Sequence, residues 1–106
     1  MSRYNSLFIV YDRILRNYQV NPENRENEKY LDEARLAVID MACMSLDPVI
    51  DDELWHHAYE VKALFHAYAK EPGAVRDGNN NWNKANLFTT VSDECGVLFS
   101  SLRKLK

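Results

Sequence analysis

The segment from Leu31 to Leu46, which reads LDEARLAVIDMACMSL, constrains the fold of this chain more than any other stretch. Its last thirteen residues include only three strongly polar ones, Arg35, Asp40 and Ser45. At about 3.6 residues per turn, the apolar side chains fall into two stripes about 140° apart around a helix. A helix with two apolar sides cannot lie on a surface, so each stripe needs something to cover it. The first stripe is Leu31, Ala34, Val38 and Met41, and the second stripe is Leu36, Ile39, Cys43 and Leu46.

Three further segments carry apolar residues at helical spacing, and prolines separate the four segments from one another. Pro22 favours a helix start, Pro48 ends the central segment, and Pro72 with Gly73 ends the third. These patterns predict an all-α, antiparallel up-down-up-down four-helix bundle. We expect one domain over residues 1–106, because the last helix cannot bury its apolar face alone. The helices are expected near residues 3–18, 24–46, 49–70 and 83–105.

The composition, with 46% hydrophobic and 27% charged residues, is typical of soluble globular proteins. No apolar run is long enough for a signal peptide or a membrane span, so we expect a cytoplasmic protein with no membrane partner. The formal net charge of −3 argues weakly against a nucleic-acid partner. Cys43 and Cys95 lack metal-binding spacing, and we expect both to be reduced, buried thiols.

The motif Glu53-x-x-His56 has the carboxylate and imidazole spacing of di-iron helical bundles. Such a centre needs a second Glu-x-x-His and two more inward glutamates, and neither is present. The apolar stripe of this helix also turns Glu53, His56 and Glu60 towards solvent, and His66 lies off the stripe as well. We therefore expect an exposed polar helix face here and no metal.

A second enzymatic pattern is Glu23-x-x-Glu26, which resembles the first half of the magnesium site of all-α nucleotide pyrophosphohydrolases. The second half, a Glu-x-x-Asp on a following helix, is missing. No glycine-rich nucleophile elbow or phosphate loop occurs either. We therefore expect no enzyme and no cofactor, and a metal-dependent nucleotide hydrolase is kept as a lesser alternative.

Nucleic-acid binding is the other alternative, because the second and third helices, joined by a short turn, resemble a helix-turn-helix. The recognition helix of that motif would begin with Asp51, Asp52 and Glu53, which repel phosphates. A regulatory nucleic-acid-binding protein is therefore a weaker hypothesis than a protein-binding one.

The tyrosines allow two interpretations. Tyr4, Tyr11 and Tyr18 are seven residues apart on the first helix, and Trp55, Tyr59 and Tyr68 follow the third. They are either large residues at the edge of the core, with hydroxyls that reach water, or part of a protein-binding face.

Two further regions are candidate binding surfaces. The second stripe, together with residues outside the core face of the first helix, could form one apolar patch that a partner or a second copy covers. A tilted fourth helix or the 71–83 loop could cover the stripe instead. The other region is the end of the bundle where the two asparagine-rich loops, residues 19–27 and 71–83, are expected to lie together. We call it the loop end. The residues expected to bind a partner are Ile9, Val10, Leu36, Ile39, Cys43, Leu46, Asn79, Asn80 and Trp82.

Together these features favour a small, acidic, non-catalytic helical bundle that binds another protein and associates with itself as a homodimer. Inhibitors, immunity proteins and antitoxin-like factors of bacteria or their phages often have this size and charge. The comparison is with that class only, because the chain carries no family motif.

Overall fold

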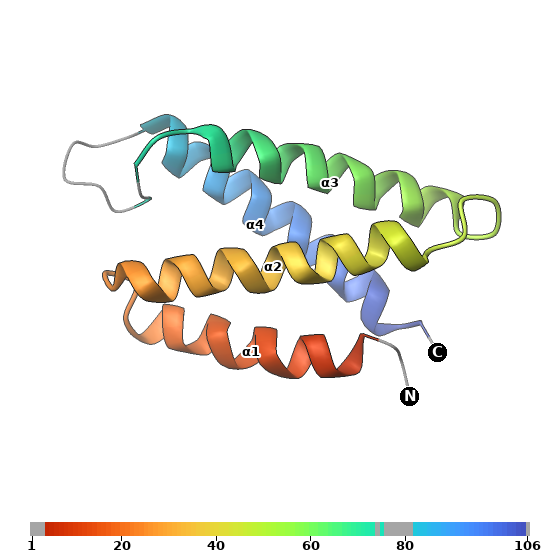
Figure 1. Cartoon of the computed structure of the whole chain (residues 1–106), viewed down its shortest axis with the longest axis horizontal. Coiled ribbons are helices and arrows are strands. Elements are labelled where there is room, and N and C mark those ends of the chain that lie inside the picture. The colour runs from red at the N-terminus through yellow and green to blue at the C-terminus, as the bar shows by residue number, and fades with distance from the viewer. Residues whose placement is uncertain (1–3, 74, 76–81, 106) are drawn as a thin grey trace.

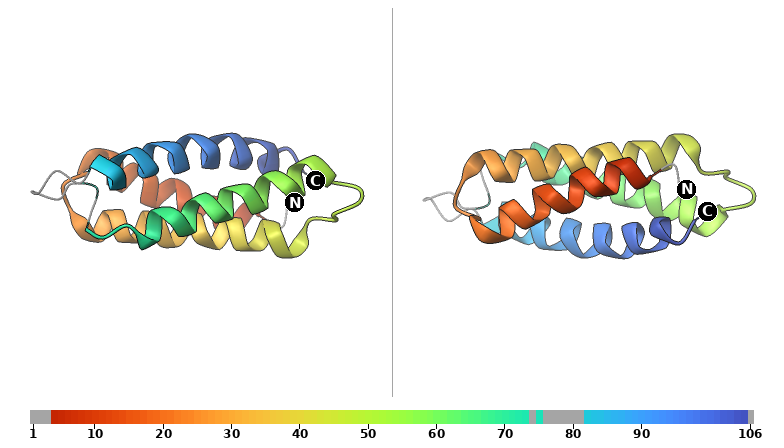
Figure 2. Two further views of the ribbon diagram at one scale, coloured as in Figure 1. Left: turned by 90° about the horizontal axis from the view of Figure 1, so that it is seen from above. Right: turned by 90° about the horizontal axis from the view of Figure 1, so that it is seen from below.

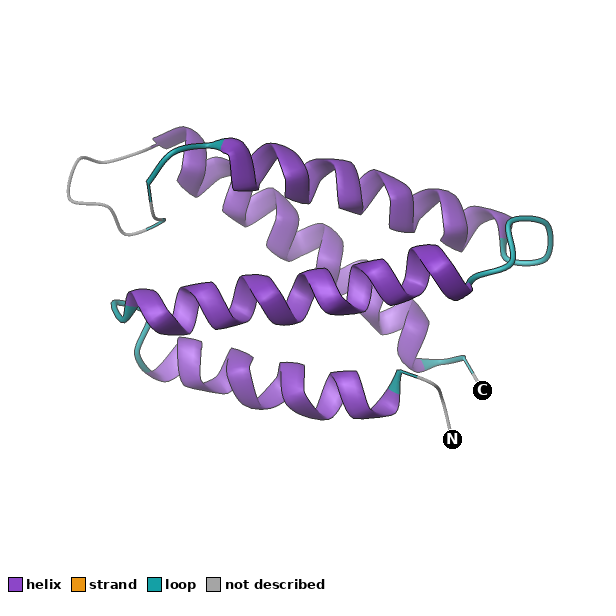
Figure 3. Cartoon of the chain, in the orientation of Figure 1, coloured by secondary structure: helices purple, strands orange, loops and turns teal. Residues whose placement is uncertain are grey.

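The computed structural model describes residues 4–73, 75 and 82–105, and within these ranges it contains four helices and no strand (Figure 1). The predicted all-α four-helix bundle is thereby confirmed. Figure 1 shows successive helices running in opposite directions along the long axis, with short connections drawn in teal in Figure 3. The helices are α1 (Asn5–Val20), α2 (Arg25–Ser45), α3 (Asp52–Lys70) and α4 (Trp82–Arg103).

The ends of α2 follow from local side-chain chemistry. The Asn24 side chain accepts a hydrogen bond from the Glu26 backbone N–H at 2.9 Å, which caps the first turn. Glu26 and Glu28 add negative charge where the helix dipole favours it. The helix ends at Leu46, which is extended, one residue before Asp47-Pro48. The start of α2 lies in the range predicted from the sequence.

The second stripe of α2 is buried inside the chain, so the expectation that it forms an exposed patch is wrong. Ile39 is fully buried, Cys43 and Leu46 are nearly so, and Leu36 is half-buried against the same core. The reason is the position of α4, which runs obliquely behind α2 from the side of α3 towards the side of α1 (Figure 1). As a result α2 contacts all three other helices, and both of its apolar sides face protein.

Aromatic side chains fill the space between α1 and α4. Phe99 contacts Phe8 and Tyr11 edge to face, with ring centroids 5.6 and 5.1 Å apart. Arg103 lies over the Phe8 ring at 4.1 Å and donates to both carboxylate oxygens of Asp12, at 2.6 and 3.3 Å. These contacts attach α1 to the end of α4.

Three of the tyrosines belong to the core, but the hydroxyls of Tyr4 and Tyr68 bond to protein groups instead of reaching water as the first interpretation expects. Tyr4, Tyr11 and Tyr68 are buried, and the Tyr4 hydroxyl is 2.7 Å from the Ser45 hydroxyl on α2. Tyr59 is exposed beside Trp55, with ring centroids 4.7 Å apart.

The two ends of the bundle differ in what they carry. Both chain termini lie at the end that holds the α2–α3 connection, and the α1–α2 and α3–α4 connections lie at the opposite end (Figure 2). Among the described residues, no helix combines the length and the apolar character that crossing a membrane requires.

Candidate protein-binding surface

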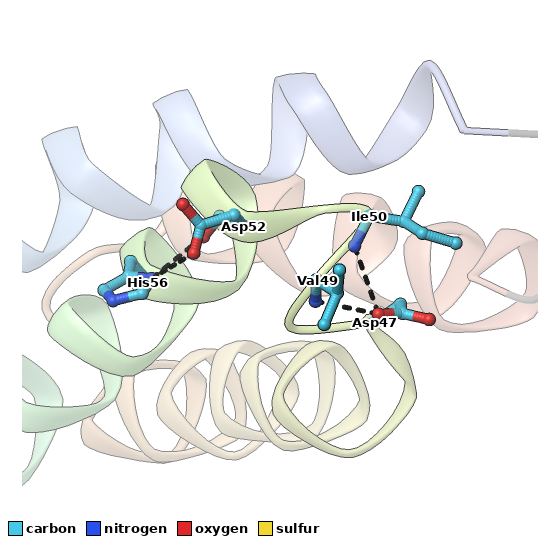
Figure 4. Close-up of polar contacts among 5 residues, drawn as sticks. All are labelled: Asp47, Val49, Ile50, Asp52 and His56. Atoms are coloured by element: carbon cyan, nitrogen blue, oxygen red, sulfur yellow. Dashed lines mark hydrogen bonds and ion pairs between the residues drawn. The ribbon is translucent and has the colours of Figure 1, made fainter.

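The connection between α2 and α3, residues 47–51, is a short turn that its own first side chain holds in place. The carboxylate Oδ1 of Asp47 accepts the backbone N–H groups of Val49 at 2.8 Å and Ile50 at 3.1 Å (Figure 4). The Asp51 N–H donates to the Asp47 carbonyl oxygen at 2.8 Å, and Pro48 has a restricted φ. We call these five residues the α2–α3 turn. Its backbone is fixed without help from the core.

This turn presents two large aliphatic side chains to water. Val49 is 84% exposed and Ile50 is 81% exposed. Figure 4 shows the Ile50 side chain projecting away from the turn. Met44, on the last turn of α2, is exposed as well. Adjacent exposed apolar side chains on an ordered backbone are typical of a docking site.

Acidic groups surround the two aliphatic side chains. The N–H groups of Val49 and Ile50 hold the pKa of Asp47 below its ordinary value. Asp52, the first residue of α3, pairs with the exposed His56 at 3.1 Å. Asp51 and the exposed Glu53 follow Ile50 closely in the sequence, and we call Asp47, Asp51, Asp52 and Glu53 the acidic rim.

The basic residues near the C-terminus form no ion pair with this rim within the described residues. Arg103 pairs with Asp12 on α1, and no lysine or arginine pairs with Asp47, Asp51 or Glu53 there. Arg3 and Lys106 lie outside the described residues. The turn is therefore apolar at its tip and anionic around it.

A shallow cleft of about 330 Å³ opens between α3 and α4 beside the turn, lined by Glu53, Leu54, His57 and Ser101. The imidazole Nε2 of His57 is 2.8 Å from a Glu94 carboxylate oxygen, so one ring nitrogen is already engaged across the two helices. The cleft joins one aliphatic side chain to polar groups, and the described residues hold no group of three or more His, Cys, Asp or Glu side chains that could bind a metal.

The residues of the two enzymatic patterns point outward. Glu53, His56, Glu60 and His66 are exposed, as the α3 stripe predicts. Glu23 lies before α2 and is exposed.

The residues predicted to bind a partner are distributed unevenly. Ile9 and Val10 are about half exposed on α1, as expected, but the structure does not unite them with the second stripe of α2. Asn79 and Asn80 lie outside the described residues. Trp82 is 74% exposed, and it is the first residue of α4 instead of a loop residue.

Sequence reasoning missed a buried polar cluster at the loop end of the bundle, made of Glu28, Asp32, Arg35, Tyr68 and Lys84. Its first three members follow an i, i+4, i+7 spacing on α2, and this spacing beside Leu31 is the signal that could have found them. Glu28, Arg35 and Lys84 are at least 94% buried. Such residues are almost never fully buried unless they are paired.

Most contacts of the buried polar cluster join one helix to another. The Tyr68 hydroxyl donates to Asp32 at 2.9 Å, and burial raises the pKa of Asp32 to about 6. The Lys84 ammonium donates to the carbonyl oxygens of Tyr68 and Glu71, at 2.9 and 3.0 Å, and so caps the end of α3.

Two other members of the cluster are only partly satisfied. One Glu28 oxygen accepts the Val75 N–H at 3.0 Å, and the other has no hydrogen-bond partner among the described residues. Arg35 lies over the Phe88 ring at 5.3 Å, and two of its buried nitrogens have no hydrogen-bond partner in the same part of the chain. The hydrogen bonds of the cluster join the start of α2, the end of α3 and the start of α4 at the loop end of the bundle, and they make a structural role the simplest interpretation.

Comparisons of the chain with protein-family models, with curated proteins and with solved structures give no match, so the functional argument depends on the residues described above.

Proposed function

We propose that this chain is a non-catalytic protein-binding module whose α2–α3 turn inserts into an apolar, basic-rimmed pocket of another protein. The observation that carries the proposal is the exposure of Val49 and Ile50 on a backbone that Asp47 already orders. Because the rim of the turn is acidic, we expect the rim of the partner's pocket to be basic.

The energetics of such a contact favour a short turn of this kind. Fully burying one valine or isoleucine side chain contributes about 1.5 to 3 kcal/mol, so Val49 and Ile50 together supply about 3 to 6 kcal/mol of favourable transfer free energy. Because the turn is ordered before binding, little conformational entropy is lost on docking. The acidic rim adds steering that salt screens.

Size and charge place the proposed module beside the small inhibitor, immunity and antitoxin-like proteins of bacteria and phages, acting in the cytoplasm. A nucleic-acid partner is disfavoured by the exposed acidic groups at the start of α3, Asp52 and Glu53. Hydrolysis of nucleotides is disfavoured because the sequence lacks the Glu-x-x-Asp half of the magnesium site, and Glu23 and Glu26 belong to no candidate metal-binding group within the described residues.

Comparative capture from native cells tests the proposal. The wild-type chain and a Val49→Ser, Ile50→Ser variant serve as baits, with quantitative mass spectrometry as the readout. The matched control is Val20→Ser. Val20 is 80% exposed and is the last residue of α1, at the end of the bundle away from the α2–α3 turn. We expect one protein to be enriched by the wild type and the control and depleted at least tenfold with the turn variant.

The captured protein is then purified and titrated with each variant by calorimetry at low and high salt. Affinity should fall with salt and with the turn substitutions. Equal enrichment of every protein by all three baits would contradict the proposal.

A further inference from the structure

Three aromatic rings contact one another near the start of α3. The indole of Trp55 lies beside the imidazole of His56 and the phenol ring of Tyr59, with ring centroids 5.1 and 4.7 Å away. Trp55 is half-buried and packs against the core, whereas His56 and Tyr59 are exposed. We call these three residues the α3 ring cluster. It presents aromatic surface to water on a side chain that the core holds in place.

The backbone and one carboxylate also hold the α3 ring cluster in position. The Trp55 N–H donates to the Asp51 carbonyl oxygen at 2.8 Å, within the first turn of α3. The His56 Nδ1 is 3.0 Å from the Asp52 carbonyl oxygen and 3.1 Å from its carboxylate. Figure 4 shows Asp52 and His56 next to the α2–α3 turn. Because the rings are ordered in advance, a ligand that contacts them loses little affinity to conformational entropy.

The surroundings of the α3 ring cluster are anionic. Residues 51–62 include four acidic side chains and one lysine, and this lysine is paired with an α2 carboxylate at 3.6 Å. Asp52 and Glu60 lie four residues before and after His56, so they are its neighbours on the helix surface, and both are exposed. No lysine or arginine in the described part of the chain forms an ion pair with either carboxylate. The cluster therefore lies between two negative charges that the chain's own basic residues leave uncompensated.

Ring faces attract cations through their quadrupole, and tryptophan does so most strongly. This chain uses the effect between α4 and α1, where Arg103 lies over the Phe8 ring at 4.1 Å. Over residues 4–73, 75 and 82–105, no lysine or arginine lies over the rings of Trp55 or Tyr59. The α3 ring cluster thus combines two features that select a cation, aromatic faces and neighbouring carboxylates.

We propose that the α3 ring cluster binds a guanidinium group, the side chain of an arginine that the partner protein supplies. The planar group stacks on the aromatic faces and donates its N–H groups to the neighbouring carboxylates. Arginine fits better than lysine, because a guanidinium is planar and more weakly hydrated than an ammonium group. As a statement about the partner, this inference rests on the proposed function and gives the chemistry of the expected basic rim. The binding of a guanidinium itself does not depend on Val49 or Ile50.

The charges of the site disfavour other occupants. A phosphate or a nucleic-acid backbone would meet the like charges of Asp52 and Glu60. An apolar helix laid along this side of α3 would remove both carboxylates from water without giving them partners. An arginine side chain satisfies the rings and the carboxylates together.

Nuclear magnetic resonance of the nitrogen-15-labelled chain tests the proposal. The probe is a five-residue peptide with two arginines between glycines, blocked at both ends. The chain has two tryptophans, and Trp82→Phe identifies which indole N–H signal belongs to which. Trp82 is 74% exposed at the start of α4, at the opposite end of the bundle, so it is an internal control. We expect the Trp55 signal to shift with a dissociation constant on the order of millimolar, and the Trp82 signal to stay in place.

Two matched peptides separate stacking from charge. A peptide with citrulline in place of arginine keeps the planar shape without the charge, and it should not shift the Trp55 signal. A peptide with lysine keeps the charge, and it should bind about two- to fivefold more weakly than the arginine peptide. Equal affinity for the lysine and arginine peptides would overturn the proposal, because the site would then respond to charge alone.

Substitutions locate the site. Tyr59→Leu removes one exposed ring and should weaken binding of the arginine peptide about two- to fivefold. Tyr30→Leu is the matched control, because Tyr30 on α2 is 49% exposed and Tyr59 is 45% exposed, and it should bind like the wild type. The Val49→Ser, Ile50→Ser variant should also bind like the wild type, so failure of the ring cluster is distinguishable from failure of the α2–α3 turn. Unchanged affinity in Tyr59→Leu, or equal shifts of both indole signals, overturns the proposal.

Discussion

The partly buried carboxylate of Asp32 leads to a quantitative prediction of how the free energy of unfolding depends on pH. Burial raises its pKa from the ordinary 3.8 to about 6, partly opposed by the hydrogen bond from Tyr68 and by the charges of Arg35 and Lys84. The folded chain therefore holds the proton of Asp32 at pH values where the unfolded chain has lost it. Below about pH 3.8 both states are protonated and this group contributes nothing. Above about pH 6 both are ionised, and the folded state carries the full cost of a buried carboxylate.

The difference between 3.8 and about 6 corresponds to about 3 kcal/mol. Replacing Asp32 with Asn removes the charge and leaves a carbonyl oxygen that can accept the Tyr68 hydroxyl. We expect Asp32→Asn to be close to the wild type in free energy of unfolding near pH 4. Its advantage should grow to about 3 kcal/mol by about pH 7.

Urea unfolding followed by far-ultraviolet circular dichroism, at several pH values between about 4 and 7.5, measures this difference. Subtracting the wild-type free energy of unfolding from that of the variant at each pH removes the contribution of the other carboxylates. Asp93→Asn, a change at an exposed α4 residue, is the matched control and should follow the wild type at every pH. A difference for Asp32→Asn that stays constant with pH would show that the Asp32 carboxylate is not buried as described.

Three further changes test the packing. Ile39→Lys should lower the free energy of unfolding by at least about 3 kcal/mol, because it places a charge in the core. Thermal melting measures this loss, and an unchanged melting temperature would contradict the burial of the second stripe. Lys84→Met should lower the free energy of unfolding by about 2 to 4 kcal/mol, because the carbonyl oxygens of Tyr68 and Glu71 lose their charged donor. Urea unfolding measures the loss, and an unchanged free energy of unfolding would mean that water replaces the ammonium group. Burial raises the pKa of Cys95 to about 11, so a disulfide-exchange reagent at neutral pH should modify this thiol only after unfolding, and rapid reaction in the native protein would refute its burial.

Much of the fold could be predicted from the spacing of apolar residues. The four stripes give four helices, and the observed start of α2, at Arg25, agrees with the predicted start near residue 24. The burial of Ile39 and Cys43 could not be assigned in the same way. A helical wheel shows which sides of α2 are apolar, but the neighbour that covers each side depends on the oblique path of α4. A tilted fourth helix is one of four alternatives that the sequence leaves open, beside the 71–83 loop, a partner protein and a second copy of the chain.

The candidate surface was harder to predict than the fold. The Asp47-Pro48 pair signals a turn, and an aspartate side chain that accepts following N–H groups is common in turns. The outward direction of Val49 and Ile50 depends on where the core ends, which the sequence alone does not define. The buried Arg35 and Lys84 were missed because a pattern based on hydropathy assigns every charged residue to the surface.

The side-chain contacts of Phe99 and Arg103 with Phe8 and Tyr11, which join α4 to α1, affect how the bundle opens locally. Backbone contacts join α1 closely to α2, whereas its attachment to α4 depends on Phe99 and Arg103 side chains reaching across. Rings and a guanidinium at a helix end can separate from α1 while α1 stays packed on α2. The separation of α1 from α4 should therefore need less free energy than global unfolding, and the amide hydrogens of α1 and α2 should exchange with deuterium together as one cooperative unit.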